Sequence, residues 1–133
     1  MFPNLDAFIR RFDTETFWVA TEICSEADHR RRVLVTEAFI RIAMRCRDAN
    51  NMFSMCAIVG GLNVAPVRRF KRMWGEVGGK LVDGLREMEG VMSPYQNMKA
   101  YRERIAGVVS PIVPALRTRG KRKGGSKCIY VCL

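Results

Sequence analysis

The stretch "ETFWVATEICSEADHRRRVLVTEAFIRIAMRC", from Glu15 to Cys46, decides the fold class. Apolar residues recur in it at steps of three and four, which is the period of an amphipathic helix. From about residue 26 to residue 47, one face of the predicted helix is apolar and charged side chains occupy the other. The apolar positions are Val33, Val35, Ala38, Phe39, Ile42, Ala43 and Cys46.

The helical pattern extends toward the N-terminus in two pieces. Leu5 to Phe12 carry the first apolar stripe, and Phe17 to Ile23 carry the second. Asp13 and Thr14 separate them, and either side chain suits the cap of the second piece. We therefore expect a break at this point. Trp18, like Trp74 further along, sits on an apolar stripe and is predicted to pack in the core.

The rest of the chain also favours helices. Met52 to Val59 predict a short buried helix that ends at Gly60-Gly61, and Pro66 suits the first turn of another helix. A stripe from Leu81 to Met92 follows, and Asn97 is a candidate cap for a last helix. No strand alternation is visible before the terminal "CIYVCL". The predicted fold is all-α, an orthogonal multi-helix array.

Charge is concentrated near the C-terminus. The 133 residues include 23 Lys and Arg against 13 Asp and Glu, and six basic residues with no acid lie between Arg117 and Lys127. Such a segment has too little apolar content to offset the entropy of ordering it. We therefore predict one helical domain over residues 1–116 and a disordered basic tail over residues 117–133.

Cysteine usage and hydropathy limit the class of protein. Five scattered cysteines and a single histidine predict neither a disulfide framework nor a zinc site, and no cofactor is implied. No secretion signal or apolar run of about 18 residues is present. No nucleophile with a base, nor a paired carboxylate site, is recognisable. We expect a cytoplasmic protein that acts by contact rather than by covalent chemistry.

Several motifs occur together in a fixed order. They are "IRRFDTETFWVATEI", "FIRIAMRC", "NN", "AIVGGLN", "MSP", "N.K.YR" and "P.VP". This series resembles the catalytic domain of Ras-type guanine-nucleotide exchange factors over about residues 2–116. The resemblance implies an all-helical domain that binds the switch regions of a Ras-family GTPase and speeds GDP release. Whether the GTPase is of the Ras, Rap or Ral type does not follow from these motifs.

The departures from the family pattern carry expectations of their own. The family has helices before "IRRF" and a wedge-forming helical hairpin after "P.VP", and neither has a counterpart in these 133 residues. We therefore expect weak exchange by this chain alone and exposed apolar surface. Within the match, Phe53 stands where the family has a polar residue, and Val64-Ala65 replace residues that cap a helix.

The resemblance makes Asn50, Asn51, Arg68 and Tyr101 candidates for GTPase contact. A structural role is the alternative interpretation for each of them. The Asn pair would form a turn and a helix cap, Arg68 would belong to a solvated helix face, and Tyr101 would pack against neighbouring side chains.

The tail suggests a second class of function. Cys128 and Cys132 follow the basic run and are candidates for palmitoylation, which together with the charge implies weak association with the inner face of the plasma membrane. Prenylation is excluded because the fourth residue from the end is Tyr130. The alternative to an exchange factor is thus a basic helical protein that binds nucleic acid or anionic membrane through residues 117–127, although no nucleic acid is expected as partner.

Overall fold

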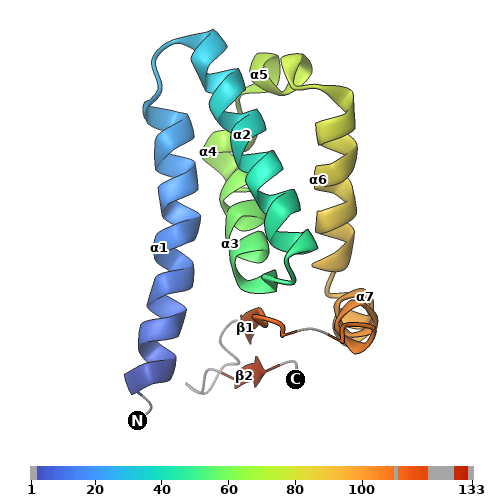
Figure 1. Cartoon of the computed structure of the whole chain (residues 1–133). Coiled ribbons are helices and arrows are strands. Elements are labelled where there is room, and N and C mark those ends of the chain that lie inside the picture. The colour runs from blue at the N-terminus through green and yellow to red at the C-terminus, as the bar shows by residue number, and fades with distance from the viewer. Residues whose placement is uncertain (1–2, 110, 120–127, 132–133) are drawn as a thin grey trace.

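The computed structural model describes residues 3–109, 111–119 and 128–131, with backbone only for residues 116–119 and 128–131. This part of the chain forms seven helices and one two-stranded antiparallel ribbon (Figure 1). The elements are α1 Pro3–Ser25, α2 His29–Asp48, α3 Met52–Leu62, α4 Ala65–Arg68, α5 Lys71–Glu76, α6 Gly79–Val91, α7 Tyr95–Ala106, β1 Leu116–Arg119 and β2 Cys128–Val131. The predicted all-α class is confirmed.

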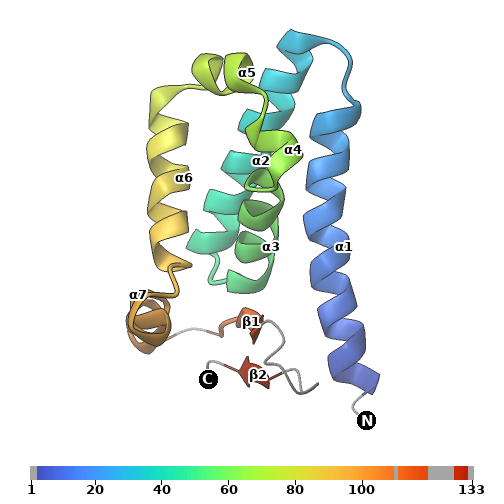
Figure 2. The same ribbon diagram turned by 180° about the vertical axis from the view of Figure 1, so that it is seen from behind.

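The helices pack around α3. Nine of its eleven residues are buried, as the apolar run from Met52 predicted. The predicted stop at Gly60-Gly61 is wrong, because α3 continues through both glycines to Leu62, where these residues pack close to α1. Helix α1 lies on one side of α2 and α6 on the other, while α3 and α4 lie behind them (Figures 1 and 2). Helix α7 crosses below the end of α6. This arrangement buries one side of α1 and one side of α2 and leaves the opposite sides open to solvent.

A glycine allows the closest approach in this core. A Cβ atom at Gly61 would lie 2.5 Å from the carbonyl oxygen of Thr16 and 2.7 Å from Cβ of Val19. Distances this short are not found between real side chains, so α3 can rest against α1 only because residue 61 has no side chain. The contact brings α3 against the middle of α1.

The predicted break at Asp13-Thr14 is wrong, because α1 is continuous. The Thr14 hydroxyl donates a hydrogen bond of 2.8 Å to the Arg10 carbonyl one turn back, so this side chain bonds within the helix instead of capping it. An ion pair of 2.9 Å between Arg11 and Glu15 also spans the position. Both interactions are compatible with an uninterrupted helix.

The unusual Phe53 has a structural partner on α1. Its ring is buried, with centroids 4.3 Å from Phe8 and 5.5 Å from Phe12. The apolar residue at a position where the family has a polar one is therefore part of the core between α1 and α3.

Helix α7 does not start at the predicted cap. Gln96, Asn97 and Met98 have φ angles of 48°, 56° and 61°, so the chain makes a left-handed turn before the regular helix. The Asn97 side chain makes no capping bond. The backbone carbonyls of Gln96 and Asn97 instead accept hydrogen bonds from Arg102, each 3.1 Å long.

Seven residues of the predicted tail, 117–119 and 128–131, lie in the two-stranded ribbon. β1 and β2 pair antiparallel, with Leu116 opposite Val131 and Arg119 opposite Cys128. The "CIYV" sequence of β2 contains β-branched and aromatic residues, which favour a strand. Residues 120–127, 132 and 133 lie outside the described part, and so does the Cys132 candidate.

Candidate functional site

One face of α1 points away from the core. It carries an open hollow lined by Arg10, Asp13, Thr14, Phe17, Trp18 and Thr21, and these six residues are called the α1 outer face. Phe17 is 64% exposed and Trp18 is 50% exposed. Adjacent exposed aromatic side chains are a feature of the apolar patches at which proteins bind one another, so this face is a candidate contact surface.

The helical period explains why these aromatics are outside. Val19 and Ile23 are fully buried against α3, and Phe17 is about 200° around the helix from Val19. Phe17 therefore points to solvent. Trp18 lies at the seam between α1 and α2, where its ring meets Phe39.

The two tryptophans differ from each other. The prediction of core packing is wrong for Trp18, because the apolar stripe of α1 that is buried runs through Val19 and Ile23 instead. It is confirmed for Trp74, which is partly buried against the core and donates a 3.1 Å hydrogen bond from Nε1 to the Val67 carbonyl.

The Asn pair has structural roles. Asn50 has a φ of 58°, a left-handed conformation that Asn tolerates well in turns. Asn51 caps α3, since its Oδ1 accepts a 3.1 Å hydrogen bond from the Ser54 amide. The Asn50 carbonyl also accepts from the Val113 amide at 3.0 Å. The cap-and-turn interpretation thus accounts for both residues.

Arg68 joins three elements. Its guanidinium donates to Glu89 of α6, donates to Asn63 at the end of α3 with Nε 2.7 Å from Oδ1, and stacks 4.7 Å above the Trp74 ring. Helix α4 has no side-chain cap at its first turn, as the Val64-Ala65 sequence predicted, and Asn63 does not supply one. Arg68 remains partly exposed, so a GTPase contact at this residue stays a prediction.

Tyr101 is 1% exposed, and its hydroxyl oxygen accepts a 2.8 Å hydrogen bond from the Ala115 amide. The backbone of Val113 meanwhile bonds to residues 50, 52 and 53. Residues 111–115 are therefore strapped across the α2–α3 turn, and Tyr101 serves this packing. Of the predicted contact residues, the strap brings Asn50, Asn51 and Tyr101 together, while Arg68 belongs to a separate cluster.

The thiols of the helical body differ in exposure. Cys24 is exposed, Cys46 is partly buried and Cys56 is buried. Burial raises the pKa of Cys56 to about 12, and burial together with the charge of Glu15 raises the pKa of Cys46. No group of three metal-ligating side chains occurs among the described residues. In the same part of the chain, no helix has the length and hydropathy to cross a membrane.

The α1 outer face is thus a candidate contact surface. Comparison with known proteins assigns the chain to a family. A model described as "RasGEF domain" matches residues 1–122. The chain belongs to the RasGEF domain family. The resemblance recognised in the motifs is confirmed.

Relatives with curated names agree with this assignment. A "Rap guanine nucleotide exchange factor" of Caenorhabditis elegans is 40% identical over 114 residues, which are 84% of this chain and 8% of the relative. Human "Rap guanine nucleotide exchange factor 6" is 37% identical over 80% of this chain and 7% of its own length. "Ras guanine nucleotide exchange factor Q" of Dictyostelium discoideum is 35% identical over 84% of this chain and 9% of its own length. The chain thus spans less than a tenth of each of these three relatives.

Sequence reasoning missed the α1 outer face of this RasGEF chain. A signal was present, since Phe17 and Trp18 are consecutive and consecutive helical residues are about 100° apart. Only one of two such neighbours can point to the centre of the core. The buried pair Val19 and Ile23 then leaves Phe17 outside.

Proposed function

We propose that this chain binds a Ras-family small GTPase and promotes release of its GDP, with the α1 outer face as part of the contact. The observation that carries the proposal is the exposed Phe17-Trp18 pair with Arg10 and Asp13 beside it. Aromatic residues and arginine are enriched at protein interfaces and carry much of their binding energy. The names of the relatives support a Ras or Rap GTPase as the partner.

Exchange of this kind needs no covalent step. A protein that binds the nucleotide-free GTPase more tightly than the GDP-bound form lowers the GTPase's affinity for GDP by the same factor. A rigid binding surface favours this, because less conformational entropy is lost on association. The α1 outer face has such support from α3, through Gly61, and from α2, through Phe39.

Weak exchange by this chain alone stays part of the proposal. The resemblance places a wedge-forming hairpin after the "P.VP" segment, and no helix follows α7 within residues 107–109, 111–119 and 128–131. The helical body would then hold the GTPase more effectively than it opens the nucleotide site. Binding and release therefore have to be measured separately.

The test is release of a fluorescent GDP from purified Ras and Rap proteins, with capture of the nucleotide-free GTPases on immobilised chain alongside. Phe17→Ala should weaken capture by about tenfold or more, as expected for an aromatic anchor. The matched control is Tyr95→Ala, which removes an aromatic residue of α7 that is 72% exposed. Equal loss in both variants, or no capture by the folded chain, would refute the proposal.

Cytoplasmic location and recruitment to the plasma membrane through residues 117–127 are further predictions. Their support is the six basic residues of that segment, which attract anionic surfaces over about one Debye length. Deleting residues 117–133 should abolish binding to phosphatidylserine vesicles and leave GTPase capture intact. If GTPase capture is lost with the tail while the truncated chain stays folded, the basic-tail alternative becomes the better account.

A further inference from the structure

Helix α2 has an outer face that none of the other helices in the described part of the chain covers. This α2 outer face consists of Arg31, Leu34, Ala38, Arg41, Ile42 and Arg45, all of them exposed. Leu34 is 61% exposed and Ile42 is 45% exposed. The other sides of α2 pack on α1, α3, α5 and α6. Leu34 lies one turn before Ala38 and Ile42 one turn after it, so the three residues form a ridge of the kind that packs against another helix.

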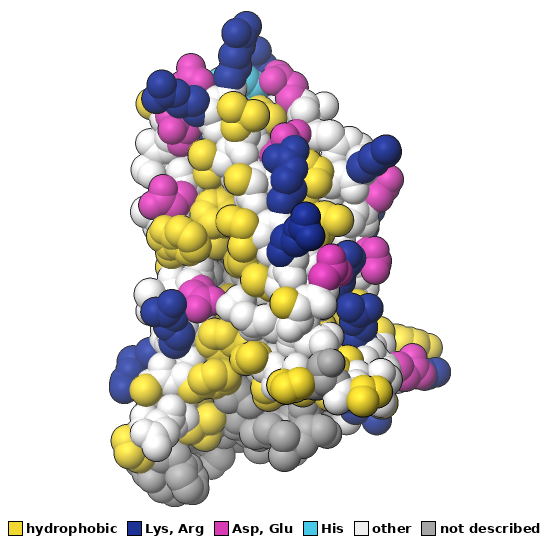
Figure 3. Space-filling model, in the orientation of Figure 1, with side chains coloured by type: hydrophobic (Ala, Val, Ile, Leu, Met, Phe, Trp, Pro, Cys, Tyr) yellow, Lys and Arg dark blue, Asp and Glu magenta, His cyan; other side chains and the backbone are white. Residues whose placement is uncertain are grey.

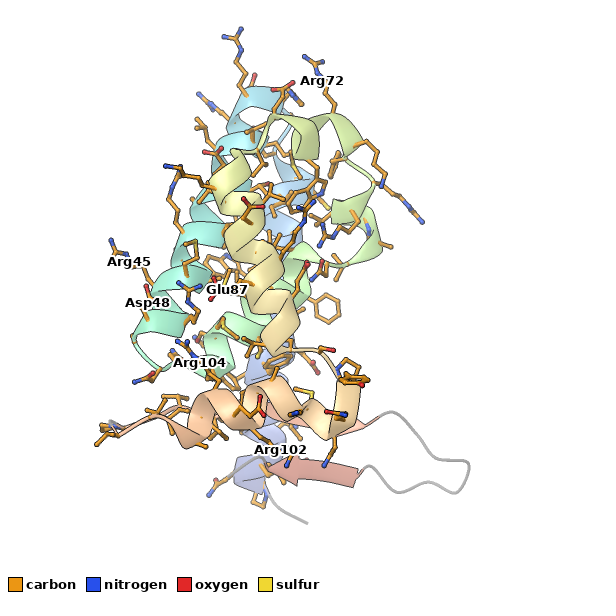
Figure 4. All side chains as sticks on the ribbon, turned by 90° about the vertical axis from the view of Figure 1, so that its right-hand side faces the viewer. Arg45, Asp48, Arg72, Glu87, Arg102 and Arg104 are labelled. Atoms are coloured by element: carbon orange, nitrogen blue, oxygen red, sulfur yellow. The ribbon has the colours of Figure 1, made fainter. Side chains whose placement is uncertain are left out.

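The charge on this face has one sign. Its three ionisable residues are arginines, and no acid is among the six. Arg41 is paired with Glu37, with 3.1 Å between Nη2 and Oε2. Arg31 and Arg45 make no ion pair within the described part of the chain, and Figure 4 shows Arg45 pointing away from α6. Two guanidinium groups are thus available to carboxylates of a partner.

Acidic side chains border the face on both sides. Glu22 is exposed one turn beyond Trp18, on the side of α1 that faces α2. On the other side, Glu87 of α6 forms an ion pair of 3.2 Å with Arg47, and Asp83 is exposed one turn earlier. Figure 3 shows hydrophobic and basic groups along the middle of this view, with acidic groups interspersed with basic ones toward its left and right edges.

The acidic side chains beside the face distinguish a membrane from a single helix as the partner. A flat anionic membrane would bring its charges against Glu22 and Asp83 as well as against the arginines. A single helix is about 10 Å wide and can carry its acidic residues in one line, so it can pair with the arginines of α2 alone. The α2 outer face is also long enough, since Leu34 to Ile42 spans about 12 Å and Arg31 to Arg45 about 21 Å along the axis.

We propose that the α2 outer face binds an amphipathic helix of a partner protein. Leu34, Ala38 and Ile42 receive its apolar ridge, and Arg31 and Arg45 pair with an Asp or Glu near each end of that ridge. In recognition of this kind, the apolar anchors of the bound helix recur every three or four residues. The site is separate from the α1 outer face and does not depend on the proposed GTPase.

The probe is a fluorescein-labelled peptide of about 18 residues, cross-linked as a helix, with leucine at every fourth position of one face and glutamate at both ends of that face. Fluorescence anisotropy with the full chain should give saturable binding. Arg31→Glu with Arg45→Glu should weaken it by about tenfold. The control is Arg86→Glu, because this arginine lies on α6, outside the α2 outer face, and 74% of its side chain is exposed.

A reciprocal exchange of charge makes the test decisive. A peptide with lysine in place of both glutamates should bind the double variant better than the original chain. Circular dichroism melting checks that the variants fold. Absence of saturable binding at millimolar peptide, or equal weakening by Arg86→Glu, overturns the proposal. Concentration-dependent self-association that needs Leu34, or binding of the face to phosphatidylserine vesicles in place of the peptide, also overturns it.

Discussion

The indole ring of Trp18 meets the ring of Phe39 edge-on, with centroids 5.1 Å apart and an interplanar angle of 85°. Edge-to-face geometry is favourable for aromatic pairs. Trp18 therefore links α1 to α2 while half of its surface stays open to solvent. Its neighbour Phe17 is more exposed and lies further from the core. The two aromatics of the α1 outer face thus differ in what they contribute to folding.

Truncating them should separate stability from binding. Trp18→Ala should lower the free energy of unfolding by about 1–2 kcal/mol, because it removes the contact with Phe39 and part of a buried surface. Phe17→Ala should change it by less than about 0.5 kcal/mol, as for most exposed positions. Urea denaturation followed by circular dichroism measures both. Equal destabilisation by the two variants would contradict the placement of Phe17.

Alanine substitution at two adjacent glycines of α3 should change the stability of the fold in opposite directions. Gly61→Ala forces a methyl group against the Thr16 carbonyl and Val19, so we expect a loss of about 2 kcal/mol of stability. Gly60→Ala meets nothing closer than 3.7 Å, at Cγ2 of Thr16. There the higher helix propensity of alanine should increase stability by up to about 1 kcal/mol. Thermal melting of the two variants checks the sign of each change.

Equal effects of the two substitutions would mean that α3 does not approach α1 as closely as described. A loss of GTPase capture by Gly61→Ala under conditions where the variant is still folded would support a rigid α1 outer face. The Gly60→Ala chain should capture the GTPase as well as the original does.

The sequence predicted elements better than it predicted their ends or their exposed faces. Helices α2 and α3 follow from long periodic or apolar runs, and both lie where the pattern placed them, but α3 does not end at Gly60-Gly61 as predicted and continues to Leu62. The break at Thr14 was predicted from residue type, but a threonine hydroxyl can also bond back to the helix, and local sequence does not decide between the two. Exposure of Trp18 depends on where α3 lies, which is a tertiary property.

Contacts between segments that are distant in the chain could not be predicted from the sequence. The bond from the Ala115 amide to Tyr101 and the bonds from Val113 to the α2–α3 turn join residues far apart in the chain. Neither spacing nor composition carries information on such pairs. The candidate contact residues chosen from motifs were for the same reason largely residues that hold the fold together.

The contact between Glu76 of α5 and His29 of α2 should make stability depend on pH. Nε2 of His29 lies 3.0 Å from Oε1 of Glu76, and Arg72 pairs with the same carboxylate at 3.2 Å. Interaction with His29, and to a lesser degree with Arg72, lowers the pKa of Glu76. A carboxyl whose pKa is lower in the folded than in the unfolded state stabilises the fold above its ordinary pKa. That contribution is lost as the pH falls below about 4.5 through the folded-state value.

The check is unfolding by urea across the acidic pH range. Glu76→Gln should flatten the decline of stability below the ordinary carboxyl pKa, whereas Glu103→Gln should not. Glu103 is a suitable control because it is exposed and only loosely paired, 3.8 Å from Nζ of Lys99. A decline that is equally steep in the Glu76→Gln chain would show that the pair with His29 does not contribute.

The thiols should react with iodoacetamide in the order of their exposure. The thiolate is the reactive form, and burial raises the pKa of Cys56 to about 12, so almost none is ionised at about pH 8. Cys24 is exposed on α1 and should be modified first, with Cys46 slower because it is partly buried and its pKa is raised. Mass spectrometry of tryptic peptides resolves these sites from the cysteines of the tail. In guanidinium chloride, where the fold is lost, the three rates should converge. If native Cys56 reacted as fast as Cys24, α3 would not be the central helix of the folded chain.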